Sequence, residues 1–333
     1  MPVPARIAAP PPEDSAQPFP CKPDALNPPP RHPDTMTESA QQVSITADDG
    51  YVVRGTYFAA NPRCAQPLAA LVNCGAGIPA RHYRRFAEYL ASVGIAALTY
   101  DYRGIGLSRP QAMRHFTATI EDWAEHDCRA AIDWLRARCP DATLVGIGHS
   151  VGGVLFGGAP NAHLLARFVM LGAHTGYYGD YRRTYRLPMA LLWHGVMPTM
   201  TALFGYFPAR MLRLGDDIPK GVAMQWAKRR SPFVRRAPHL PRDRMGRLVD
   251  RCAQLQGDAL ILTFTDDGFA TAAGAARVRE FFPMLNVEHW VIAPADVGAR
   301  RLGHFGFFRR AAAATIWPRL LAHLTGNGSA RAG

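Results

Sequence analysis

A serine flanked by glycines is the clearest chemical signature in this 333-residue chain. Ser150 is the centre of the pentapeptide GHSVG, which has the pattern G-x-S-x-G. Apolar, β-favouring residues from Thr143 to Ile147 precede it and predict a buried strand, and the small and apolar residues after it favour a helix. So tight a turn admits only glycine two residues before and after the serine. We therefore predict that Ser150 is a nucleophile on a strained turn above a sheet edge.

A serine nucleophile needs a base, and the base needs an anionic partner that fixes its tautomer. The segment TDDGFA holds two adjacent carboxylates, Asp266 and Asp267, and His304 lies between glycines late in the chain. His149 adjoins the serine but would point away from it along the backbone, so a structural or pocket-lining role suits it better. The predicted chemistry is acyl transfer to the serine, with an imidazole as the base.

Negative charge on a substrate oxygen would need two backbone N–H donors. One should be the N–H of Val151, which begins the helix after the nucleophile. The other should come from the loop after the predicted strand Leu68–Asn73, where we favour Ala76 and keep Gly75 as the alternative.

Strands and helices alternate from residue 41 onward. This order predicts a mostly parallel, doubly wound sheet with helices on both faces, and an initial hairpin adds an antiparallel edge. Active sites in such sheets lie at the carboxyl ends of the strands. The predicted strands are 43–47, 51–57, 68–73, 95–100, 143–147, 168–171, 259–264 and 287–292, and the predicted helices include 81–93, 119–138 and 311–324.

The order of G-x-S-x-G, acidic loop and late histidine resembles the α/β-hydrolase fold superfamily. The segment DYRGIGLS at 101–108 resembles that superfamily's D-x-R-G-x-G-x-S turn, in which Asp101 and Arg103 would brace a loop. With GHFGFF at 303–308, the chain is similar to uncharacterised bacterial capped serine hydrolases of the esterase or lysophospholipase type. The resemblance covers about residues 41–325.

The resemblance implies roles for the late residues. His304 stands where the superfamily carries its base, and the acidic loop matches best with Asp267, rather than Asp266, as the acid. Asp266 would then cap the turn or the helix after it. The sequence NCGAG at 73–77 departs from the superfamily's usual H-G, which leaves the second oxyanion donor open.

A long segment separates the predicted strands that end at Leu171 and begin at Ala259. In the resembled superfamily such an insertion covers the active site, which implies a helical cap at 174–251 between core segments 41–173 and 252–325. Residues 187–208 hold no Asp, Glu, Lys or Arg and could span a bilayer by length. Three prolines and two glycines should break this stretch into short pieces, so we expect an apolar cap with at most weak interfacial membrane contact. The aromatic residues expected to wall the site are Tyr177, Tyr178, Tyr181, Trp193, Phe204, Tyr206, Phe207 and Trp226.

Composition limits the other classes of function. The net charge is +12, but 15 basic and 5 acidic residues of the segment 174–251 account for most of it, and no nucleic-acid motif is present. The six cysteines have no C-x-x-C or metal-like spacing, and the N-terminus resembles no export signal, so we expect reduced thiols in a cytoplasmic protein without metal or cofactor. The sequence does not specify the oligomeric state.

The two ends of the chain should lie outside the folded unit. Residues 1–40 are rich in proline and predict a disordered tail, residues 326–333 predict a flexible one, and translation could begin at Met36.

These observations predict a serine hydrolase that cleaves an ester or related acyl bond of a hydrophobic small molecule. An acyltransferase on the same triad, or a non-catalytic ligand-binding protein on the same scaffold, is the alternative. Arg182, Arg183 and Arg229 could recruit an anionic head group, although a solvated surface role suits them better.

Overall fold

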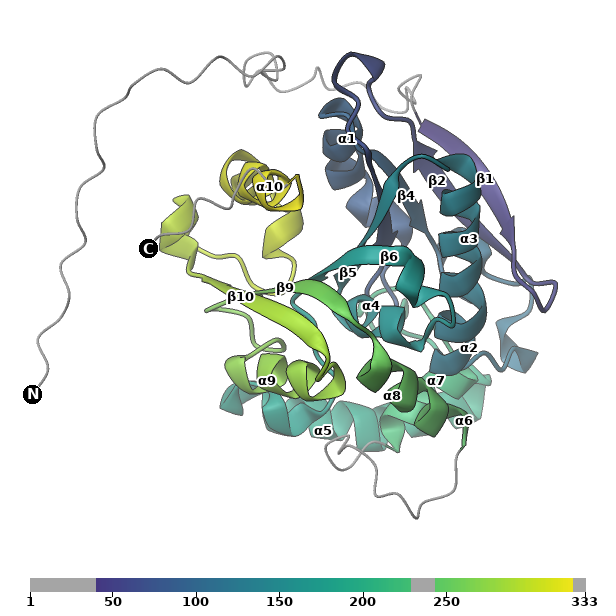
Figure 1. The fold of residues 1–333 in the computed structure, drawn as a ribbon. Helices are drawn as coiled ribbons and strands as arrows, with labels where there is room; N and C mark the ends of the chain where they lie inside the picture. The colour runs from purple at the N-terminus through teal and green to yellow at the C-terminus, as the bar shows by residue number, and fades with distance from the viewer. Residues whose placement is uncertain (1–39, 229–242, 326–333) are drawn as a thin grey trace, which may run out of the picture.

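An eight-stranded sheet is the frame of the computed structural model, which describes residues 40–228 and 243–325 (Figure 1). The strand order is β1-β2-β4-β3-β5-β6-β9-β10. β1 pairs antiparallel with β2, β2 antiparallel with β4, and the remaining neighbours are parallel. The strands are β1 (Ala40–Thr46), β2 (Val52–Phe58), β3 (Leu68–Asn73), β4 (Ala96–Tyr100), β5 (Thr143–His149), β6 (Leu165–Leu171), β9 (Gly257–Phe264) and β10 (Leu285–Ile292).

The predicted mostly parallel sheet with an antiparallel edge is therefore confirmed. The edge hairpin closes because the N–H of Ala47 bonds to the carbonyl of Tyr51 at 2.8 Å, with Gly50 at φ 85° completing the turn. Met36 and the predicted tails, apart from residue 40, lie outside the described residues.

Helices cover both faces of the sheet (Figure 1). α1 presents Phe86 and Leu90 to the sheet, where they join Phe307 and Trp317 in one core cluster with α10. The opposite face carries α3, α4, α8 and α9, whose apolar side chains form the second cluster. The helices of the two layers are α1 (Arg84–Ser92), α2 (Ile120–Asp122), α3 (Arg129–Arg138), α4 (Val151–Leu155), α8 (Arg244–Gln254), α9 (Ala272–Phe281) and α10 (Arg310–Leu324).

The insertion, defined as the chain between β6 and β9, begins with three helices that lie together at one side of the sheet (Figure 1). They are α5 (Arg183–Leu191), α6 (Met197–Phe204) and α7 (Lys220–Ala227), and a two-stranded ribbon of β7 (Tyr206–Phe207) and β8 (Ile218–Pro219) lies between the last two.

The prediction that prolines and glycines break this stretch into short pieces is wrong. α5 and α6 are joined by a π-helical turn into one continuous 22-residue helix from Arg183 to Phe204. Pro188 is exposed, where water can bond to the carbonyl that it leaves unpaired, and Pro198 follows a widened π-helical turn at Leu192–Val196. The helix ends at Gly205, whose φ of 81° is left-handed.

The boundary predicted between residues 251 and 252 falls inside α8. Leu248 and Cys252 of this helix pack against Gly158 and Gly157, just after α4, and Arg251 bonds to the carbonyl of Gly158 at 3.1 Å. α8 therefore belongs with the core layer, and the rest of the insertion lies before it.

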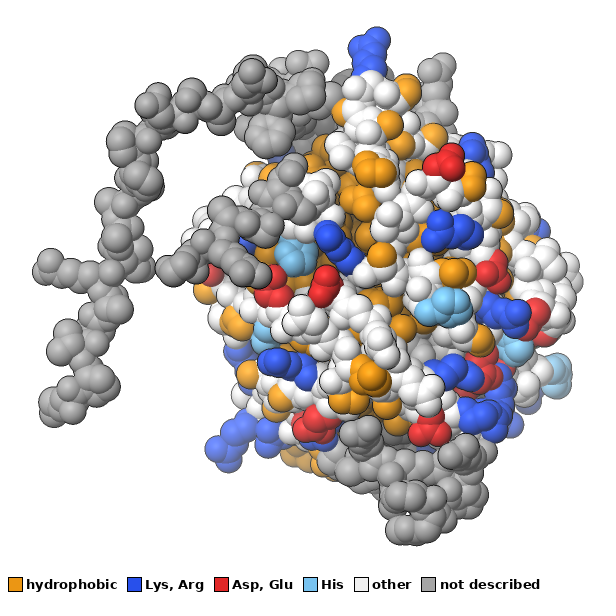
Figure 2. All heavy atoms as spheres, in the orientation of Figure 1, with side chains coloured by type: hydrophobic (Ala, Val, Ile, Leu, Met, Phe, Trp, Pro, Cys, Tyr) orange, Lys and Arg blue, Asp and Glu red, His pale blue; other side chains and the backbone are white. Residues whose placement is uncertain are grey.

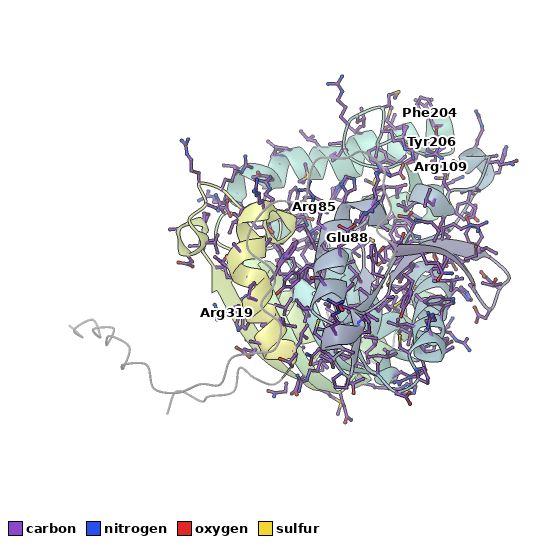
Figure 3. The ribbon with its side chains drawn as sticks, turned by 90° about the horizontal axis from the view of Figure 1, so that it is seen from above. Arg85, Glu88, Arg109, Phe204, Tyr206 and Arg319 are labelled. Atoms are coloured by element: carbon purple, nitrogen blue, oxygen red, sulfur yellow. The ribbon has the colours of Figure 1, made fainter. Side chains whose placement is uncertain are left out.

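The contact between α1 and α10 should contribute strongly to stability. The ring of Phe86 is buried, 4.9 Å from that of Phe307 and 5.2 Å from that of Trp317. We expect Phe86→Ala to lower the free energy of unfolding by about 3–5 kcal/mol in urea titrations, because it leaves a cavity. Its exposed neighbour Arg85, labelled in Figure 3, is the control, and Arg85→Ala should change the same quantity by less than about 0.5 kcal/mol. Equal effects would contradict this packing.

Candidate active site

The turn at Ser150 is strained as its sequence predicts. Ser150 lies between β5 and α4 with φ 56° and ψ −126°, an unfavourable conformation for a residue with a side chain. A Cβ at Gly148 would lie 2.5 Å from the carbonyl carbon of Gly152, and one at Gly152 would lie 2.5 Å from the carbonyl oxygen of Cys74. Both glycines are therefore required by close backbone contact.

His304 is paired with Asp267. Its Nδ1 lies 2.8 Å from Oδ2 of Asp267, while Oδ1 of the same carboxylate accepts the N–H of Phe269 at 2.8 Å. Burial alone would raise the pKa of Asp267, but the hydrogen bonds from His304 and from backbone N–H groups outweigh it and lower the pKa below its ordinary value. The ionised carboxylate accepts the Nδ1–H of His304, which leaves the Nε2 lone pair as the basic atom.

The neighbouring carboxylate, Asp266, has a different task. Its two oxygens accept the N–H groups of Leu302 and Gly303 at 2.9 and 3.0 Å. It thus holds the loop that carries His304, and the expectation that it caps the turn or the following helix is wrong. α9 is capped instead by the side chain of Thr271.

Ser150 forms its side-chain hydrogen bond with a histidine that sequence reasoning missed. Its Oγ lies 3.2 Å from Nε2 of His174, and among the described residues no hydrogen bond joins it to His304. The Nδ1 of His174 accepts the N–H of Gly176 at 3.0 Å, so Nε2 carries the proton and donates to the serine oxygen. The signal was its position, three residues after β6 at the carboxyl edge of the sheet.

A chain of hydrogen bonds joins the loops around the serine. His149 Nε2 lies 3.0 Å from the carbonyl of His304, which can only accept, so this nitrogen is protonated. The hydroxyl of Tyr83 therefore donates to His149 Nδ1 at 2.9 Å and accepts the N–H of Gly75 at 2.7 Å. Burial, and then the nearby imidazole of His304, lower the pKa of His149 well below its usual value, which keeps it neutral. His149 is thus a buried connector, in agreement with its predicted structural role.

Gly75 and Ala76, the two candidates for the second oxyanion donor, differ in their contacts. The N–H of Gly75 already bonds to Tyr83, whereas Ala76 lines the same cavity as Ser150. Val151 is the first residue of α4, so its N–H has no acceptor within the helix.

The remaining residues of the D-x-R-G turn are structural in their contacts. Asp101 accepts the N–H groups of Ala80 and Leu107 at 2.6 and 2.8 Å. Arg103 pairs with Asp127 at 2.7 Å. Neither lines the cavity, in agreement with their predicted role in bracing a loop.

Ser150, His174 and His304 open on a cavity of about 700 Å³ whose walls are mainly apolar. Of the eight aromatic residues expected around it, Tyr181, Trp193, Phe207 and Trp226 line it. The other four do not. Phe204 and Tyr206 lie away from it beside Arg109, whose guanidinium is 5.6 Å from the ring of Tyr206 (Figure 3). The insertion supplies further apolar lining from Met189, Leu192, Met197, Ala209, Leu214 and Ile218.

Comparisons with known proteins agree with this architecture. Residues 66–200 match the model of a family described as Serine aminopeptidase, S33. An esterase from Pyrococcus furiosus is 16% identical, with a TM-score of 0.54 over 90% of this chain and 96% of that chain. An α/β hydrolase from Penicillium sp. sh18 is 17% identical, with a TM-score of 0.55 over 88% and 99%. The chain has the α/β-hydrolase fold.

A third similar structure, an esterase from Exiguobacterium antarcticum, is 14% identical, with a TM-score of 0.51 over 85% of this chain and 99% of that chain. No curated protein sequence matches this chain. The predicted α/β-hydrolase fold is confirmed, and the match to the family model supports hydrolase activity. The matched segment contains Ser150 and ends before Asp267 and His304.

The hydroxyl of Tyr83 in the hydrogen-bond network beside Ser150 offers a direct test of that network. Tyr83→Phe removes the hydroxyl that bonds to Gly75 and His149 and leaves two buried polar groups without a partner. We expect the free energy of unfolding in urea to fall by about 1–3 kcal/mol. Tyr89→Phe, in the helix α1 that follows Tyr83, is the matched control, because the ring of Tyr89 packs on Trp317 and its hydroxyl has no hydrogen bond among the described residues. A loss no larger than that of the control would contradict the network.

Proposed function

We propose that this α/β hydrolase is a serine esterase that cleaves carboxylic esters of hydrophobic small molecules. One arrangement carries the proposal: the His304–Asp267 pair, 2.8 Å apart, opens on the same apolar cavity as the strained Ser150. A carboxylate-bound imidazole with a basic Nε2, beside a serine on a strand-to-helix turn, is the apparatus of acyl transfer.

In the proposed reaction, Nε2 of His304 takes the proton of the Ser150 hydroxyl as Oγ attacks the acyl carbon. The N–H groups of Val151 and Ala76 stabilise the oxyanion. The imidazolium, held by Asp267, then protonates the departing alcohol and leaves an acyl group on Oγ. A water molecule deprotonated by His304 attacks the acyl-enzyme and releases the acid.

His174 acts beside the base in this scheme. Because its Nε2 carries a proton, it cannot take the proton of Ser150, but its N–H can hold the serine oxygen. The hydroxyl proton of Ser150 is then directed away from His174 and towards His304. We assign His174 the role of orienting the nucleophile.

The walls of the cavity favour an apolar acyl or alkyl group. Tyr181, Trp193 and Phe207 offer rings, and about 700 Å³ is enough for a medium-sized ester. The insertion, which supplies much of this lining, would serve as the cap over the site.

A peptide substrate with a free amino group, as the name of the matched family suggests, fits less well. Such a substrate needs an unpaired carboxylate for its ammonium group. Asp216 is the carboxylate among the described lining residues, and it already binds the guanidinium of Arg210 and the N–H of Gly106.

Covalent labelling tests the nucleophile. A fluorophosphonate probe should modify Ser150, as measured by mass spectrometry of the labelled peptide, and Ser150→Ala should give no adduct. The wild-type protein should hydrolyse p-nitrophenyl esters, with kcat/KM rising with acyl length until the cavity is filled. Labelling at another residue would overturn the proposal. Faster transfer to an added alcohol than to water would indicate an acyltransferase, and ester binding without turnover a ligand-binding protein.

The two histidines can be separated by their variants. We expect His304→Gln and Asp267→Asn to lower kcat by about 10³–10⁴, because each removes the correctly oriented base. His174→Gln keeps an N–H donor for Ser150 and should cost little, whereas His174→Phe should cost about tenfold, the worth of one hydrogen bond. If His174→Gln were as inactive as His304→Gln, His174 would be the base instead.

A further inference from the structure

Exposed apolar side chains gather on the insertion. Among the described residues, eight of the thirteen large hydrophobic side chains that are exposed lie between Leu187 and Leu214. The most exposed are Leu187, Leu191 and Leu203, at 68, 61 and 64%. We call the exposed apolar side chains of the helix 183–204 and of the loop 211–214 the docking face. Such a concentration costs solubility and marks an interaction surface.

The helix behind this face has two different sides. Trp193, Met197 and Thr201 are buried, and Met189 and Leu192 line the cavity. The rest of the helix is largely exposed, and only 17% of its most apolar 18-residue segment is buried. By length and composition the helix could cross a membrane, but its inner side is part of the cavity wall, and its chain returns to strand β9. This geometry suits a helix that lies along a membrane surface.

The loop 211–214, which exposes apolar side chains, is held by backbone hydrogen bonds. Arg213 has a left-handed φ of 55°, which allows the N–H of Leu214 to bond to the carbonyl of Ala209 at 2.9 Å. The N–H of Asp216 then fixes the loop to the carbonyl of Gly77 at 2.7 Å. Leu214 is 55% exposed and also lines the cavity, so the docking face is continuous with the cavity mouth.

The charged side chains within the segment that forms the docking face are all basic. Residues 181–215 contain five arginines and no Asp or Glu, and Arg183 and Arg213 stand exposed near opposite ends of the face. In the view of Figure 2, by contrast, basic and acidic side chains are interspersed across the surface. A second copy of the chain, docked by the same face, would oppose arginines to arginines. Anionic phosphates beside an apolar layer complement both the arginines and the leucines.

We propose that this face docks the protein on an anionic phospholipid bilayer, with Leu187, Leu191 and Leu203 among the acyl chains and the arginines at the phosphates. The cavity mouth would then lie at the membrane surface, where apolar substrates partition. The docking itself requires no catalysis, so it can be tested with the inactive Ser150→Ala protein.

Vesicle co-sedimentation tests the proposal. The full chain carrying Ser150→Ala should bind vesicles of phosphatidylcholine and phosphatidylglycerol in equal parts more tightly than vesicles of phosphatidylcholine alone. Adding Leu187→Ser and Leu191→Ser should weaken binding to the mixed vesicles by at least about tenfold. Adding Arg183→Gln and Arg213→Gln should weaken binding to the mixed vesicles about fivefold for each arginine. Added salt should also weaken this binding, because it screens the attraction between the arginines and the phosphates.

The matched control replaces exposed apolar side chains by serine on another surface of the protein. Met284 and Val291, at 52 and 59% exposed, lie near β10, and their replacement by serine should leave vesicle binding unchanged. Thermal melting curves must coincide for all variants. Equal vesicle binding by the leucine and control variants would overturn the proposal. So would a dimer that the leucine substitutions convert to a monomer, because the face would then join two copies.

Discussion

The close contact between Gly152 and the end of β3 is the constraint on which the site depends. No side chain fits where the first turn of α4 meets the carbonyls of Asn73 and Cys74, so the helix start and the loop after β3 are pressed together. That contact brings the N–H of Val151 and the loop of Ala76 to one place, and it holds Ser150 in its left-handed conformation. The strain at Ser150 persists because the surrounding sheet over-determines it.

Hydrogen bonds extend this constraint to the loop that carries His304. Tyr83 and His149 connect the loop after β3 with the backbone of His304. Asp266 holds the loop that carries His304 through the N–H group of Leu302. The two adjacent aspartates thus have separate roles. Asp267 binds the imidazole of His304, and Asp266 binds backbone N–H groups. Of the three histidines around the serine, His149 and His174 carry the proton on Nε2 and His304 carries it on Nδ1, and each assignment follows from a backbone or carboxylate partner.

Local sequence was sufficient for the sheet, because its strands are apolar runs ended by glycine, proline or charge. β3 matches its predicted limits, and the other strands differ by a few residues at their ends. The pairing of His304 with Asp267 followed from chain order in a resembled superfamily. His174 could not be found in this way, since its contact with Ser150 depends on how the insertion leaves β6. The unbroken helix 183–204 was missed because its prolines are accommodated locally, Pro188 at an exposed position and Pro198 just after the π-helical turn.

The π-helical turn at Leu192–Val196 sets the rotational phase between the two halves of that helix. Removing one residue from the turn would rotate everything after it by about 100°, the angle per residue of an α-helix. Met197 and Thr201 would swing out of the interior, and leucine side chains now in solvent would swing in. The additional residue in the π-helical turn thus keeps the same side of the helix facing the interior before and after the turn, while the opposite side faces solvent.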